Sequence, residues 1–206
     1  MQAYMKSEMP FLGIQAPALR RVCRDVFAAH PLSSRNELEE LVLDMWRRAE
    51  FREERYAALA LLARYPQWVS LPLLERLIVE GAWWDYVDTL AHRAGDLLRR
   101  DPSVAGGLRA WSRNPNLWKR RASIICQLGF RGDTDLELLY DCIEPSLDSR
   151  EFFLRKAIGW ALRDYAWHDP REVERYVREH ADRLSALSKR EATKNFVKLL
   201  EHEENR

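Results

Sequence analysis

Apolar residues recur at helical spacing along almost the whole chain. Between residues 38 and 46, for example, Leu38, Leu41, Val42, Met45 and Trp46 fall on one stripe of a helix. Patterns that alternate with a period of two, as in strands, are nearly missing. A first helix is therefore expected at 18–29, and a second begins after a cap at Ser33 or Ser34. Further helices are expected at 51–65, 68–80, 83–100, 102–113, 118–128, 133–145, 149–166, 170–179 and 188–200.

Residues that interrupt helices recur at a regular interval. Pro66, Pro102, Gly132 and Pro170 are 36, 30 and 38 residues apart, with about two helices between each pair. This spacing resembles helical-hairpin repeats of the HEAT or armadillo kind. The pattern predicts an all-α solenoid of paired antiparallel helices with a concave groove, and a single domain over residues 1–206. The helix before Gly81 is expected to end there, with glycine in the left-handed cap.

Composition narrows the class of protein and its compartment. The 206 residues are 47% hydrophobic and 32% charged, and no apolar run approaches the roughly 20 residues of a membrane span. The first six residues lack the basic and apolar pattern of a signal peptide. Three widely spaced cysteines predict reduced, buried thiols. We therefore expect a soluble, cytoplasmic monomer with no membrane partner.

The net charge of +1 conceals one strongly basic segment. Between residues 99 and 131 the single acid is Asp101, against eight bases: Arg99, Arg100, Arg109, Arg113, Lys119, Arg120, Arg121 and Arg131. A local patch of this kind can bind a polyanion although the chain is neutral on average. The alternative is a solvated helix face. The sequence leaves both interpretations open.

Motifs for metal or nucleotide chemistry are missing. The five histidines and three cysteines show no spacing such as C-x-x-C or H-E-x-x-H. There is no phosphate-binding glycine loop and no G-x-S-x-G elbow. We expect no metal and no cofactor, which leaves carboxylate, aromatic and arginine chemistry.

Two aromatic clusters are candidates for that chemistry. In Trp83-Trp84-Asp85-Tyr86-Val87-Asp88, a helix that starts at Trp84 places Trp84 and Asp88 on one face, where ring and carboxylate suit a cationic guest. Alternatively, Trp84 is core and the aspartates complement the helix dipole. The second cluster is a basic-aromatic stripe of Lys156, Trp160 and Arg163. Gly159, beside Trp160, lowers helix propensity, and such a cost suggests that the backbone closely approaches something else there.

Several motifs occur together in a characteristic order. They are Phe11-Leu12-Gly13-Ile14, residues 83–88, Leu117-Trp118-Lys119-Arg120-Arg121-Ala122, residues 151–163 and Leu187-Ser188-Lys189-Arg190-Glu191-Ala192. With this order and spacing, the chain resembles the AlkD-type family of bacterial DNA glycosylases from about Tyr4 to Lys194. The resemblance implies excision of cationic purines alkylated at ring nitrogen 3 or 7, such as 3-methyladenine and 7-methylguanine, from duplex DNA. It also implies that the lesion stays stacked rather than flipped.

The resemblance assigns roles to individual residues. Asp88 matches the catalytic aspartate, and Trp84 and Trp160 match tryptophans that contact the lesion nucleotide. Arg121 and Arg163 match basic residues of the family's DNA-binding groove, and Tyr4 matches an N-terminal tyrosine near the same site. Lys189, Arg190 and Lys194 look like backbone contacts. Lys119, Arg120 and Lys156 join the DNA-binding set because they belong to the basic segment and stripe.

The resemblance also implies one departure and leaves alternatives open. The chain begins at what corresponds to the end of an N-terminal helix in the family, so one helix is expected to be missing ahead of Tyr4. Because Asp88, Trp84 and Trp160 are retained, we expect a monofunctional, hydrolytic glycosylase that associates with the bacterial nucleoid. The alternatives are a non-catalytic HEAT-type binder of damaged or structured DNA, and a HEAT-type protein scaffold.

Overall fold

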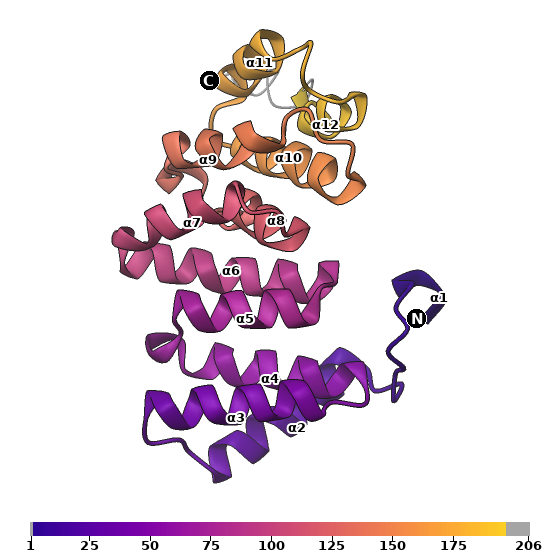
Figure 1. Ribbon diagram of the computed structural model, residues 1–206, viewed down its shortest axis with the longest axis vertical. Coiled ribbons are helices and arrows are strands. Elements are labelled where there is room, and N and C mark those ends of the chain that lie inside the picture. Colours follow the sequence, from indigo (N-terminus) through magenta and orange to yellow (C-terminus); the bar gives the residue numbers. More distant parts are fainter. Residues whose placement is uncertain (1, 197–206) are drawn as a thin grey trace. The chain divides into compact units, whose positions relative to one another are not determined.

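The computed structural model describes residues 2–196, and all regular elements in that range are helices (Figure 1). This confirms the predicted all-α fold, and the paired helices are consistent with an α-solenoid of helical repeats. The chain forms two compact units, Met1–Leu97 and Leu98–Arg206, and each is described by itself below. The expectation of one domain over the whole chain stays a prediction.

Unit 1 consists of one short α-helix followed along the chain by five longer ones. They are α1 (Gln2–Met5), α2 (Ala16–Ala29), α3 (Arg35–Arg48), α4 (Arg52–Arg64), α5 (Leu71–Gly81) and α6 (Trp84–Arg100), whose last turn passes the unit boundary. Helices α2 and α3 both pack on α4, and α3 also contacts α5. The core includes Leu38, Val42 and Trp46 of α3, all fully buried, as their shared stripe predicts.

The helix ends follow local sequence signals with one correction. The Ser34 side chain accepts a hydrogen bond from the Glu37 backbone N–H, which confirms the predicted cap. Gly81 is not the left-handed residue after α5; Ala82 is, with φ of 39°. Glycine is required at 81 for a different reason, because a Cβ there would lie 2.7 Å from Trp46 Cζ2.

A buried carboxylate holds the segment ahead of α2. Glu53 is 2% exposed, and its two oxygens accept hydrogen bonds from the backbone N–H groups of Leu12, Gly13 and Ile14 at 2.9–3.1 Å. Gly13 has φ of +86°, a conformation that favours glycine and turns its N–H toward the carboxylate. The Phe11-Leu12-Gly13-Ile14 motif is therefore explained by this structural contact.

Between residues 98 and 196, unit 2 contains six further α-helices. They are α7 (Ala105–Ser112), α8 (Leu117–Ile125), α9 (Leu136–Ile143), α10 (Phe152–Tyr165), α11 (Pro170–Glu179) and α12 (Ala186–Ala192). Helix α7 packs on α8 and α9, α8 packs on α10, and α12 lies along α10. Asn116 caps α8 as expected. The predicted start of α9 at 133 or 134 is wrong, because Asp135 is the cap and accepts from Leu138 N–H.

The tight contact between α10 and α12 confirms the expectation for Gly159. A Cβ at Gly159 would lie 2.5 Å from Glu191 Cβ and 2.8 Å from the Ser188 carbonyl oxygen. The Ser188 hydroxyl donates to the Arg155 carbonyl across the same contact. Helix α12 ends at Ala192, earlier than predicted, and residues 197–200 of that prediction lie outside the described residues.

The three cysteines, Cys23, Cys126 and Cys142, are free and buried, as predicted. Burial raises the pKa of all three thiols, and that of Cys142 reaches about 12, so they are protonated near neutral pH. Within residues 2–196, none of the helices combines the length and apolar character that crossing a membrane requires.

Candidate functional site

Three of the residues singled out by sequence gather at the start of α6. Trp84 is the first residue of the helix and Asp88 follows one turn later, so both project from the same face. Both side chains are half-buried. The Tyr4 ring meets Trp84 edge to face, with centroids 6.3 Å apart and planes at 86°. Tyr4 itself remains 77% exposed, so the cluster borders solvent.

The residues around Tyr4 are fixed to the same helix end. The Trp83 indole N–H donates to the Met5 carbonyl at 2.9 Å, and Arg52 Nη1 donates to the Ser7 hydroxyl at 2.6 Å. These two bonds join α1 and its following loop to α6 and α4. The placement of Tyr4 beside Trp84 therefore has a structural cause within unit 1.

The two aspartates at this helix end have different environments. Arg52 Nη2 lies 2.6 Å from both Asp85 oxygens, and the Tyr56 hydroxyl donates to Asp85 Oδ2 at 2.6 Å. Arg52 is 1% exposed and stacks over the Tyr86 ring at 4.2 Å. Asp85 therefore has a structural role in joining α6 to α4, and the catalytic role of Asp88 stays a prediction.

The pKa values of Arg52 and Tyr56 are both raised, which keeps Arg52 charged and Tyr56 protonated beside Asp85. Burial lowers the pKa of Arg52, but the hydrogen bonds to Asp85 and Tyr56 outweigh it and raise that pKa overall. Burial and the hydrogen bond to Asp85 raise the pKa of Tyr56 to about 12. Tyr56 therefore stays a proton donor to the Asp85 carboxylate.

The bases of α8 do not form one solvated face. Lys119 and Arg121 are 7% and 3% exposed, and Arg121 Nη1 donates to the Phe153 carbonyl at 2.7 Å while its guanidinium faces the Phe153 ring. Arg120 is half-buried and donates to the Pro145 carbonyl and the Ser146 hydroxyl. Much of this charge is thus used to join α8 to its neighbours.

On α10, the predicted basic-aromatic stripe exists but is paired with an acid. Lys156, half-buried Trp160 and Arg163 lie at successive turns of the helix. Glu191 of α12 binds both bases, with Oε1 2.7 Å from Lys156 Nζ and Oε2 2.6 Å from Arg163 Nη1. The Lys156 ammonium, followed by Arg163, lowers the pKa of Glu191 although burial opposes this. Both bases are held on either side of Trp160.

The remaining predicted contacts lie near the end of the described chain. Lys189 Nζ donates to the Ala181 carbonyl at 3.0 Å, whereas Arg190 and Lys194 are exposed. Asp88, Trp84 and Tyr4 belong to unit 1, and Lys119, Arg120, Arg121, Lys156, Trp160, Arg163, Lys189, Arg190 and Lys194 belong to unit 2. The functional roles of all these residues stay predictions.

Comparison with known proteins gives the family. The family model described as DNA alkylation repair enzyme matches residues 1–196, so the chain belongs to the DNA alkylation repair enzyme family. A solved structure described as a predicted DNA alkylation repair enzyme from Enterococcus faecalis is similar, with a TM-score of 0.84 and 29% sequence identity. That similarity covers 94% of this chain and 92% of the other. No curated protein matches the chain.

Sequence reasoning missed the partners that position these residues. Arg52, Glu53 and Glu191 were not singled out, although each organises a part of the candidate site. Glu53 and Glu54 in the first turn of α4 read as ordinary helix-start acids. Glu191 belongs to the motif at residues 187–192. It follows Ser188 by three residues, so the two side chains share one helix face, and this spacing could have indicated that both contact α10.

Proposed function

We propose that the protein is a monofunctional DNA glycosylase that hydrolyses the N-glycosidic bond of cationic alkylpurines in duplex DNA. Family membership supports a role in alkylation DNA repair. The observation that carries the finer proposal is the Trp84–Asp88 pair on one face of α6, with Tyr4 at the edge of Trp84 and Asp85 engaged by Arg52. The pair offers an aromatic face and a carboxylate to one positively charged guest.

The chemistry requires stabilisation of positive charge on the sugar. The bond between C1′ and the purine nitrogen breaks with both electrons passing to the cationic base, which leaves neutral. Water adds to C1′ and releases a proton. Asp88 would stabilise the oxocarbenium-like sugar and orient that water, a role carboxylates have in glycoside hydrolysis. The indole of Trp84 would favour the cationic lesion and sugar, and the resemblance to the family implies a similar role for Trp160.

The size of this effect is adequate for the reaction. A carboxylate about 4 Å from the developing charge, at an effective dielectric constant near 20, contributes roughly 4 kcal/mol. This corresponds to about a thousandfold in rate. Because the alkylated base already carries the positive charge that weakens its bond, no strong general acid is needed.

The proposal has the lesion stay stacked in the duplex, as the resemblance to the family implies. Unit 1 has cavities of about 720 and 480 Å³ that adjoin α6, but neither is lined by Trp84 or Asp88. An extruded base normally enters a snug pocket that holds the catalytic groups. In the proposal, the half-buried Trp84 and Asp88 would meet the DNA backbone from one face of α6.

The test is release of 7-methylguanine and 3-methyladenine from methylated duplex DNA under single-turnover conditions. Wild type would be compared with Asp88→Asn and with Asp44→Asn, which removes an exposed carboxylate from α3 of the same unit. We expect release by wild type and Asp44→Asn, and loss in Asp88→Asn.

Other outcomes separate the alternatives. Equal release by all three proteins would keep the activity and remove Asp88 from the site. Duplex binding without release by wild type would favour a non-catalytic DNA binder. Absence of both would favour a protein scaffold. A DNA adduct trapped by borohydride would contradict simple hydrolysis, because it requires an amine nucleophile.

A further inference from the structure

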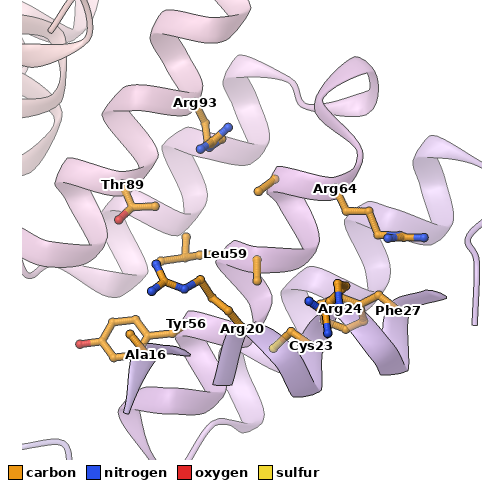
Figure 2. Close-up of a pocket in the computed structure, with 12 residues that line it drawn as sticks. Ala16, Arg20, Cys23, Arg24, Phe27, Tyr56, Leu59, Arg64, Thr89 and Arg93 are labelled. Atoms are coloured by element: carbon orange, nitrogen blue, oxygen red, sulfur yellow. The ribbon is translucent and has the colours of Figure 1, made fainter. Parts of the chain in front are cut away.

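The face of α6 that carries Trp84 and Asp88 holds a third side chain, His92. Residues four apart are rotated by only about 40° around a helix axis, so Asp88 lies between Trp84, one turn earlier, and His92, one turn later. Thr89 and Arg93 lie on a different side of the helix, where they line a cavity of about 720 Å³ together with residues of α2 and α4 (Figure 2). His92 does not line that cavity, and it shares the face of the candidate catalytic pair.

No contact within the protein accounts for the His92 imidazole. The side chain is exposed, and it forms no hydrogen bond or ion pair with any residue between 2 and 196. It is also absent from the buried core of unit 1 over that range. The imidazole is therefore free to contact a ligand or a water molecule.

Helix geometry brings this imidazole toward the Asp88 carboxylate. Side chains on a helix lean toward its N-terminus, so His92 covers the turn that carries Asp88. The Cβ atoms of residues four apart are separated by about 5–6 Å. A water held by the carboxylate can thus also reach an imidazole nitrogen, which is the geometry that a general base requires.

Other aspartates flank His92, but they are engaged with basic residues. Asp96, one turn after His92, pairs with Arg93 at 2.7 Å. Asp85, two turns before it, is held by an arginine and a tyrosine of α4. None of the other titratable groups along α6 forms a hydrogen bond or ion pair with His92. The groups that α2, α4 and α6 contribute there are Arg20, Cys23, Arg24, Arg52, Tyr56, Arg64 and Arg99.

We propose that His92, in its neutral form, is the general base of the reaction. The inference rests on the proposed glycosylase function. The C1′–N bond breaks with its electron pair on the purine, and the water oxygen forms the new bond to C1′. The proton of that water passes to an imidazole nitrogen of His92 and then to solvent. Asp88 stabilises the charge on the sugar and holds the water, while His92 takes the proton.

The contribution of His92 is smaller than that of Asp88. General bases contribute roughly 10²–10⁴-fold in rate. In an oxocarbenium-like transition state the bond to the base is already largely broken when water adds, so we expect only about tenfold here. Histidine side chains change charge between about pH 5 and 8, and the protonated imidazole has no lone pair to accept a proton. The contribution should therefore be present at the alkaline end of that range and disappear at the acidic end.

The experiment measures single-turnover release of 3-methyladenine from methylated duplex DNA between about pH 5.5 and 8. Wild type is compared with His92→Gln, whose side chain is polar but does not titrate. The matched control is His30→Gln, which removes another exposed histidine of unit 1. Saturating protein removes differences in DNA affinity, and ratios of rates remove any titration of the lesion, because all three proteins share the substrate.

The expected result is a ratio that depends on pH for one variant alone. The rate of wild type relative to His92→Gln should rise from near one at the acidic end to about ten at the alkaline end. The rate relative to His30→Gln should stay near one throughout. Added imidazole should accelerate release by His92→Ala and not by wild type, which a purely structural role of His92 does not explain.

The outcomes distinguish this inference from the proposed function. A constant ratio of wild type to His92→Gln, or no rescue of His92→Ala by imidazole, would overturn the role of His92. If wild type and His30→Gln still release base in that case, the proposed glycosylase stands. If neither of them releases methylated base at any pH, the proposed function and this inference fail together.

Discussion

Helices α6 and α10, which carry Trp84 and Trp160, are each fixed by ion pairs, but acid and base exchange places between the two helices. On α6 the acid, Asp85, belongs to the tryptophan helix and the base, Arg52, comes from a neighbouring helix. On α10 the bases, Lys156 and Arg163, belong to the tryptophan helix and the acid, Glu191, comes from α12. The same kind of contact thus engages a carboxylate of α6 in one unit and two cations of α10 in the other.

The two contacts differ in how far their charged side chains are exposed to solvent. Arg52 is 1% exposed and Asp85 13%, whereas Lys156 is 39% and Arg163 22% exposed. A buried pair that loses one partner leaves an uncompensated charge, so the first contact is structural. The second is more exposed, and we propose that DNA phosphates replace the Glu191 carboxylate there. The following predictions test this contrast.

The largest expected effect is on stability. Asp85→Asn should lower the free energy of unfolding by about 3–5 kcal/mol, because Arg52 stays buried without its counter-ion. Urea unfolding measures this, and Asp44→Asn, at an exposed pair, should change it by less than about 0.5 kcal/mol. A loss below about 1 kcal/mol would remove the structural role of Asp85. The double variant Arg52→Met/Asp85→Leu should recover part of the loss.

The second effect is on chemistry. Asp88→Asn should slow single-turnover base release by about a thousandfold, the equivalent of roughly 4 kcal/mol, with a smaller loss of unfolding free energy than Asp85→Asn. Comparable losses of stability in Asp85→Asn and Asp88→Asn would mean that the two aspartates have the same structural role. The contrast between them at the start of α6 would then disappear.

The third effect concerns the close approach of α12 to α10. Gly159→Ala should destabilise the protein by about 1–3 kcal/mol, because its Cβ meets Glu191 and the Ser188 backbone. Gly106→Ala in α7 is the matched control, since no atom lies within 4 Å of the added Cβ. That change should stabilise by up to about 1 kcal/mol through helix propensity. Thermal unfolding measures the stability of both variants. A more stable Gly159→Ala together with a less stable Gly106→Ala would contradict this prediction.

These contacts also show where sequence reasoning succeeded. Periodicity and capping residues predicted most helices, and the backbone approach at Gly159 followed from its cost to helix propensity. The pairing of Asp85 with Arg52 joins residues 33 positions apart, and one amphipathic pattern does not specify which neighbour a face meets. The same applies to Glu191 with Lys156. Gly81 was misread because its requirement comes from Trp46 rather than from local conformation.

The fourth effect is on DNA affinity. Glu191→Gln removes the acid that neutralises Lys156 and Arg163, so duplex binding should strengthen and the salt slope should rise by about 1. Salt-dependent binding of undamaged duplex measures both. Glu179→Gln, at an exposed pair with Arg175 in α11, is the control for loss of one negative charge. Weaker binding by Glu191→Gln would show that Glu191 orients the two bases rather than masking them.

The smallest effect appears in the pH dependence of stability. Because the pKa of Glu191 is lowered in the folded protein, its pairing stabilises the fold above the ordinary pKa of 4.5 and is lost as the pH falls further. Wild type should therefore exceed Glu191→Gln by about 1 kcal/mol at neutral pH, and the difference should close below pH 4. Parallel curves for the two proteins over that range would exclude this contribution.

The carboxylate of Glu53 has a practical consequence for trimming and fusing this chain. The segment before Pro17 contains little regular structure, but it is not dispensable. The backbone N–H groups of Leu12, Gly13 and Ile14 donate the three hydrogen bonds that the buried Glu53 carboxylate accepts. A protein that starts at Pro17 would leave the buried Glu53 carboxylate without these three donors. Affinity tags and reporter proteins are therefore better attached ahead of Met1 than spliced between Pro10 and Pro17.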